Sequence, residues 1–92
     1  MKTNLDELDI AINLDNYCTD EFFEKIQGSS EKTFQFLYVV LIQFKRKDLV
    51  EKYKKKINFA LIDKFSYSMW QALEEDFDFL CQLKEEYYFN FN

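Results

Sequence analysis

Residues Phe34–Phe44 read FQFLYVVLIQF, the most apolar run of the chain, which only Gln35 and Gln43 interrupt. Eleven residues are too few to cross a bilayer, since a membrane-spanning helix needs about 20 apolar residues. The run is therefore expected at the centre of a folded core. Its β-branched and aromatic residues would suit a strand, and periodicity alone does not separate strand from helix in so short a segment.

The residues on either side of this run favour a helix. Ser29 and Ser30 are good N-cap residues, and Glu31 then lies in the first turn, where a negative charge is favourable. A basic triplet at 45–47 follows the run and suits a helix C-terminus. We predict a helix over Glu31–Lys47 that is apolar nearly all round and forms the buried centre of a bundle.

The composition predicts a single small helical domain. A chain of 92 residues with 48% hydrophobic and 20% aromatic residues has enough apolar surface to form a packed globule instead of a disordered chain. It contains one glycine and no proline, so helices with short connections are favoured. We predict one all-α domain over residues 1–92, a bundle of four to five helices around the central run.

Two short segments precede the central run. Residues 4–14 fit a helix, but every second residue from 8 to 14 is apolar, which fits a strand as well. Thr19 is a good N-cap for a helix over Asp20–Gln27. Gly28 follows this helix, at the position where glycine commonly ends one.

A basic segment follows the central run, after an expected chain break near Lys47. Asp48-Leu-Val-Glu51 resembles a capping box and predicts a helix over Asp48–Lys64. Apolar residues recur along this helix at helical spacing. The same spacing places three lysines and one aromatic residue on the outward side: Lys52, Lys55, Lys56 and Phe59.

Ser68-Met-Trp-Gln71 resembles a second capping box and predicts a last helix that runs to about Tyr87 or Tyr88. Helical spacing places Phe77 and Leu80 on its inward face, together with other apolar residues. The opposite third of the helix is polar. It carries an acidic stripe formed by Glu74, Glu75, Asp78, Glu85 and Glu86. The final residues, YYFNFN at 87–92, either pack back on the bundle or form a flexible, exposed aromatic tail.

Charge is segregated along the sequence. Residues 45–64 hold eight of the twelve basic residues and only three acids, whereas residues 1–44 and 65–92 each carry a net charge of −5. The whole chain has a net charge of −5, so we do not expect free nucleic acid as its partner. No apolar run is long enough to span a bilayer, and we do not expect a membrane as a partner either.

The sequence lacks residues that many enzymes and metal sites use. It has no histidine, which excludes a Ser-His-Asp or Cys-His arrangement, and its one glycine excludes a glycine-rich phosphate loop. Cys18 and Cys81 form no CxxC motif. A disulfide between them is one alternative, and free thiols are the expectation that we favour. We predict a protein that is not an enzyme and has neither cofactor nor metal. Its first residues lack the apolar core of a secretory signal, so the cytoplasm is the expected location.

These features favour a protein that binds another protein through its acidic stripe. We expect a small acidic inhibitor, such as a bacterial toxin-immunity protein of a toxin–antitoxin pair, which covers the basic active site of a nuclease. A second acidic patch would contribute if the fold brings it alongside: Asp20, Glu21 and Glu24. The structural alternative is a solvated acidic face that the basic segment neutralises within the molecule.

Three other functions stay open at this point. A phage or other mobile-element inhibitor of a host nucleic-acid enzyme would use the same stripe as a nucleic-acid mimic. An assembly subunit would self-associate through Phe59 and the aromatic tail. A nucleic-acid-binding protein would contact phosphates through the basic residues at 45–56. The abundance of Lys, Asn, Phe and Tyr is typical of an AT-rich genome, bacterial or mobile.

Overall fold

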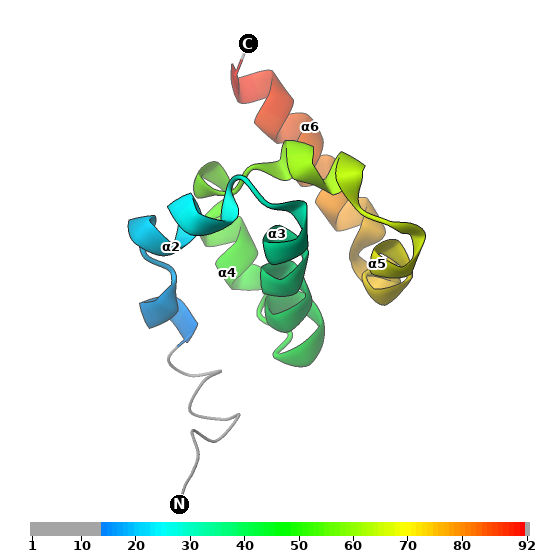
Figure 1. Cartoon of the computed structure of the whole chain (residues 1–92), viewed down its shortest axis with the longest axis horizontal. Coiled ribbons are helices and arrows are strands. Elements are labelled where there is room, and N and C mark those ends of the chain that lie inside the picture. The colour runs from blue at the N-terminus through cyan, green and yellow to red at the C-terminus, as the bar shows by residue number, and fades with distance from the viewer. Residues whose placement is uncertain (1–13, 92) are drawn as a thin grey trace, which may run out of the picture.

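The computed structural model describes residues 14–91 of the chain. Within that range every regular element is a helix and no strand occurs, which confirms the predicted all-α fold (Figure 1). The segment predicted over 4–14, as helix or strand, lies outside the described residues except for Leu14. That residue opens η1 (Leu14–Tyr17), a single 3₁₀ turn.

The first α-helix of the described chain forms as the sequence predicts. α2 covers Asp20–Ile26, and the Thr19 Oγ1 accepts a hydrogen bond from the Phe22 N–H at 3.2 Å. Phe23 and Ile26 are its buried residues. Gly28 follows the C-cap residue of α2, but its φ is not positive, so α2 ends without a left-handed glycine.

The central helix begins at the predicted place and ends early. α3 (Ser30–Leu37) continues directly into η2 (Tyr38–Gln43), a π-helical stretch. Ser29 caps it, because its Oγ accepts a hydrogen bond from the Lys32 N–H at 3.1 Å. The strand alternative for this run is therefore excluded. Helix formation stops four residues before the predicted end at Lys47.

Lys45 ends the central helix. Its φ of 53° is the only positive φ of a non-glycine residue among residues 14–91. A left-handed residue cannot continue a right-handed helix, so the chain turns here. The Arg46 N–H donates back to the Val40 carbonyl at 2.7 Å, which satisfies one carbonyl of the last turn. The predicted break near Lys47 is confirmed, since the next helix begins at that residue.

The predicted single helix over Asp48–Lys64 is wrong. The segment folds into three shorter elements: α4 (Lys47–Lys52), η3 (Lys54–Lys56) and η4 (Phe59–Lys64). Ile57 is extended between the last two. The Asn58 Oδ1 accepts a hydrogen bond from the Ala60 N–H at 3.1 Å and so opens η4 as a separate 3₁₀ helix.

The last third of the chain is also interrupted. It forms α5 (Tyr67–Ala72), η5 (Glu74–Asp76) and α6 (Phe77–Phe91). The capping box is centred on Ser66 instead of Ser68, because the Ser66 Oγ accepts from the Met69 N–H at 3.3 Å. The helical pattern breaks at Leu73 and then continues to Phe91, so residues 87–91 belong to α6.

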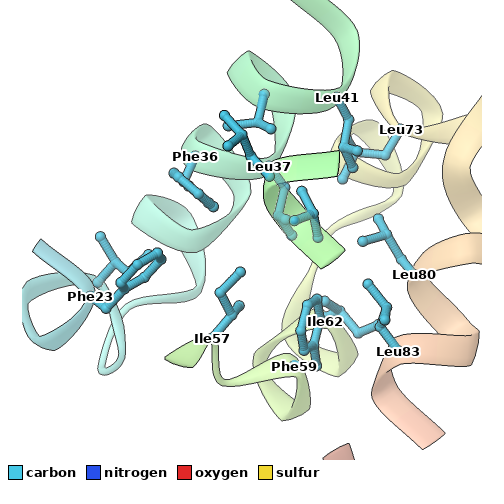
Figure 2. Close-up of a cluster of buried hydrophobic side chains, with 14 of the residues drawn as sticks. Phe23, Phe36, Leu37, Leu41, Ile57, Phe59, Ile62, Leu73, Leu80 and Leu83 are labelled. Carbon is cyan, nitrogen blue, oxygen red and sulfur yellow. The ribbon is translucent and has the colours of Figure 1, made fainter. Parts of the chain in front are cut away.

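The 3₁₀ geometry of η4 places Phe59 and Ile62 on the same side, and Leu61 is buried as well. A 3₁₀ helix has three residues per turn, so side chains three apart point the same way. Phe59, Ile62 and Phe65 follow this spacing and are 0%, 1% and 7% exposed. The outward position predicted for Phe59 is therefore wrong. In Figure 2 the Phe59 and Ile62 side chains lie beside Leu83 of α6. Leu80, also of α6, lies above them in this view.

The core lies where the central helix meets η4 and α6. Leu37 and Val40 of the central helix are fully buried, as are Leu73 and Leu80 from the last third of the chain. Phe23 of α2 extends this core, and its ring packs edge-on against that of Phe36 with 5.6 Å between centroids. Other apolar residues of the central run are only partly buried: Phe34, Tyr38, Val39 and Ile42. Residues 14–91 alone thus leave part of this helix uncovered.

Between residues 14 and 91, no helix combines the length and apolar character needed to cross a membrane.

Replacing Phe59 with alanine tests the packing of η4. Because the Phe59 ring is fully buried, Phe59→Ala should lower the free energy of unfolding by about 3–5 kcal/mol. Phe89→Ala is the matched control, since Phe89 is 82% exposed and its removal should change that free energy by less than about 0.5 kcal/mol. Urea titration followed by circular dichroism measures both. Equally small changes would contradict the buried position of Phe59.

Glycine at position 45 should stabilise the fold. A left-handed backbone costs an L-residue about 1–2 kcal/mol, which glycine avoids, and the greater freedom of glycine in the unfolded chain offsets part of that gain. Lys45→Gly should raise the free energy of unfolding by up to about 1 kcal/mol. Lys45→Val should lower it, because β-branched residues tolerate positive φ least. Thermal unfolding compares the three proteins, and a valine variant more stable than the glycine variant would contradict the left-handed turn.

Candidate functional site

The basic segment is largely neutralised by acids within the molecule. Among residues 14–91, its basic side chains form six ion pairs with acids outside or within the segment: Arg46–Asp48 (3.1 Å), Lys47–Asp76 (3.6 Å), Lys52–Asp15 (3.1 Å), Lys54–Glu51 (3.7 Å), Lys54–Glu86 (2.8 Å) and Lys56–Asp20. Four of these pairs join the segment to distant parts of the chain. The basic segment therefore neutralises several acids within the molecule, as the structural alternative to a binding function predicts.

The contacts of Asp15 with the basic segment change the pKa values of the groups involved. The Tyr53 hydroxyl and the Lys52 ammonium group both donate hydrogen bonds to the Asp15 carboxylate. These two bonds, that from Tyr53 foremost, lower the pKa of Asp15. The same carboxylate raises the pKa of Lys52 and the pKa of Tyr53. The contact ties η1 to the end of α4.

Four acids of the predicted stripe have no such partner. Within residues 14–91, no ion pair or side-chain hydrogen bond involves Glu74, Glu75, Asp78 or Glu85. All four side chains are exposed. We call these four residues the acidic face. The basic segment therefore leaves them unneutralised while it pairs with acids elsewhere.

The geometry of α6 adds an aromatic ring to the acidic face. Asp78, Gln82, Glu85 and Phe89 recur at intervals of four and three residues, so they lie on one side of the helix. All four are exposed, whereas Leu80 and Leu83 are buried on the other side. The spacing of Phe89 from Asp78 and Glu85 in the sequence already indicates this shared side, although we predicted the ring only as part of the terminal tail.

The structure separates the remaining predicted binding residues from the acidic face. Glu86 lies at the side of α6, where its carboxylate accepts a hydrogen bond from the Lys54 ammonium group at 2.8 Å. The second patch, Asp20, Glu21 and Glu24, is on α2. In Figure 1, α2 and the start of α6 lie on opposite sides of the molecule. The fold therefore does not bring the second patch alongside the acidic face.

The break at Leu73 also changes the inward face predicted for the last helix. Phe77 was expected inside, but it is partly exposed and its ring packs edge-on against Trp70, with 5.0 Å between centroids. Asp76, next to it, is buried instead and pairs with Lys47. Phe77 thus places a second aromatic ring next to Asp78 at the surface.

Among residues 14–91, no cluster of three or more Cys, Asp or Glu side chains has an arrangement that could hold a metal ion. Both cysteines are free thiols, and burial raises the pKa of Cys18.

The acidic face offers carboxylates and exposed aromatic rings for contact with a cationic surface. Comparison with family models, curated proteins and solved structures finds no significant match to this chain.

Asp63 provides a test of the internal ion pairs through pH. Its carboxylate accepts hydrogen bonds from the Lys84 ammonium group at 2.8 Å and the Tyr88 hydroxyl at 3.2 Å. These contacts, that of Lys84 foremost, hold the pKa of Asp63 below its ordinary value. A carboxylate with a lowered pKa stabilises the fold above its unfolded pKa of about 3.9, and this contribution disappears as the pH falls through the folded pKa.

Asp63→Asn should therefore be less stable than the native chain at pH 7, by up to about 1 kcal/mol for an exposed pair. The difference should shrink as the pH is lowered toward 3, because protonation then weakens the native pair. Glu75→Gln is the control, since it removes an exposed carboxylate without an ion pair in the described chain. Urea titrations at both pH values measure this, and an Asp63→Asn deficit that is the same at both would contradict it.

Proposed function

We propose that this chain is a small acidic protein that binds and inhibits a basic protein. In the most specific form of the proposal, it is a toxin-immunity protein that covers the phosphate-binding active site of a nuclease. The observation that carries the proposal is the acidic face, whose four carboxylates stay exposed and unpaired within the described chain.

The stability of the fold does not explain the acidic face. Carboxylates close together repel one another, and on a helix such pairs cost a few tenths of a kcal/mol each. Several basic side chains form ion pairs within the described chain, but their partners are other acids, such as Glu86 and Asp20. A cationic partner would relieve this repulsion and would be attracted from a distance by the same charges.

The exposed rings favour a protein as that partner. Protein interfaces combine aromatic anchors at their centre with charged residues at their rim. Phe89 lies on the same side of α6 as Asp78 and Glu85, and its side chain is almost fully exposed. A nuclease site is basic because it holds phosphate, so an acidic face with an apolar anchor is complementary to such a site.

The other candidate functions have less support. A phosphate-binding surface on the basic segment would need free lysines, yet Lys52 and Lys56 are paired with Asp15 and Asp20. Of the three outward lysines of that surface, only Lys55 has no ion pair in the described chain. Self-association was predicted through Phe59 and the aromatic tail. The Phe59 ring is buried, so only the tail, in which Phe89 is exposed, could contribute to it. An inhibitor that mimics nucleic acid would use the same acidic face, so the identity of the partner distinguishes it from an immunity protein.

Affinity capture with charge-reversed variants tests the proposal. The native chain, immobilised, should retain a basic protein from a lysate of its own organism at low salt and release at least part of it at high salt. Mass spectrometry would identify the protein. Glu74→Lys/Asp78→Lys/Glu85→Lys should fold normally, as judged by circular dichroism, and should lose this partner. With the purified partner, its Kd should rise by at least about tenfold, or about 1.4 kcal/mol.

A second triple variant controls for the change in net charge. Glu21→Lys/Glu24→Lys/Glu31→Lys alters the charge equally, at exposed positions on α2 and α3, and should retain the partner. Equal binding by both variants would overturn the proposal. Recovery of nucleic acid, or only of further copies of the chain, would favour the nucleic-acid-binding or the assembly function instead.

A further inference from the structure

The central helix lines an open groove that the described residues leave uncovered. The groove has a volume of about 540 Å³ and lies between η1, α2 and the central helix. Its surface is mainly apolar, formed by side chains that include Phe22, Ile26, Phe36, Val39 and Val40. Phe22 and Val39 are only partly buried in the structure. An apolar surface of this kind is stabilised when another apolar group covers it.

Two lysines add positive charge to the groove. Lys25 from α2 and Lys32 from α3 line it, and both side chains are exposed. Neither forms an ion pair with any residue in the range 14–91. Most lysines of the basic segment, in contrast, do have acidic partners. The groove therefore suits a ligand that is apolar on one side and carries negative charge on the other.

We propose that the occupant of this groove is the chain's own N-terminal segment, residues 1–13. This segment combines four large apolar residues with three acids: Leu5, Leu8, Ile10 and Ile12 with Asp6, Glu7 and Asp9. The apolar side chains would cover Phe36 and Val39. The acids would then lie near Lys25 and Lys32.

The connection between the segment and the groove supports this assignment. Leu14, the residue that follows the segment, itself lines the groove, so no linker has to be crossed. Along the central helix the groove extends from Lys32 to Val40, or about 12 Å at 1.5 Å per residue. Thirteen residues span about 20 Å as a helix and more when extended. The segment therefore reaches the whole groove in either conformation.

The tether also favours this occupant over a separate molecule. A segment joined directly to its site has an effective concentration in the millimolar range, which a free peptide or amphiphile has to exceed. Docking of the segment would also give the central helix the all-round burial that its apolar sequence predicts. The groove would then hold part of the chain itself, whereas the acidic face on η5 and α6 would stay open to a partner.

Photo-crosslinking in the full chain tests the proposal. p-Benzoylphenylalanine in place of Gln35, an exposed residue that lines the groove, should crosslink to residues 1–13 of the same molecule. Mass spectrometry of the digested monomer maps the crosslinks. The same probe in place of Tyr67, which is exposed and outside the groove, should give none to that segment. Crosslinks from position 35 only to residues 14–91, or to a second copy at dimer mass, would overturn the proposal.

Charge reversal and dye binding supply independent readouts. Lys25→Glu/Lys32→Glu should reduce the crosslink yield severalfold, whereas Lys55→Glu/Lys64→Glu, at exposed lysines outside the groove, should leave it unchanged. Leu8→Asp/Ile12→Asp should increase binding of the apolar dye anilinonaphthalene sulfonate severalfold, because the groove surface would then be open. Dye binding by the native chain as strong as that by this variant would show that residues 1–13 do not cover the groove.

Discussion

The burial of Phe59 and Ile62 between the central helix and α6 is the interaction on which the rest of this structure depends. η4 contacts both helices and fills the space between them. Leu80 and Leu83 of α6 are buried against η4, which fixes the rotation of α6 about its own axis. Asp78, Glu85 and Phe89, on the other side of α6, are therefore exposed to solvent. The ion pair between Lys84 and Asp63 joins the same two elements at the surface. The position of the acidic face is thus set by a packing contact in the core.

Electrostatics then divides the acids of the chain into two groups. The basic segment wraps back over the molecule after the turn at Lys45, and its lysines reach acids on η1, α2, η5 and α6. These acids are neutralised internally. Glu74 and Glu75 of η5 and Asp78 and Glu85 of α6 form no ion pair in the described chain. The proposed inhibitory surface is therefore formed by acids that no ion pair neutralises within the described chain.

A small domain has few side chains with which to cover a helix as apolar as the central one. Residues 14–91 bury the side of it that bears Leu37, Val40 and Leu41, and leave the groove beside Phe36 and Val39. The proposed docking of residues 1–13 would complete this burial. The groove and the acidic face are formed by different elements, so one surface can contribute to the fold while the other binds a partner.

The sequence by itself determined the all-α class, the capped starts of α2 and of the central helix, and the segregation of charge, because these depend on local spacing and on composition. It also identified the four acids of the acidic face. Only the tertiary structure decided that residues 48–64 break into short 3₁₀ elements, that Phe59 is inside and that Phe77 is partly exposed. A 3₁₀ helix has poorer hydrogen-bond geometry than an α-helix, so local hydrogen bonding does not favour the arrangement that this segment adopts. The choice between them came from packing against Leu80 and Leu83, some 20 residues further along the chain, which no local pattern contains.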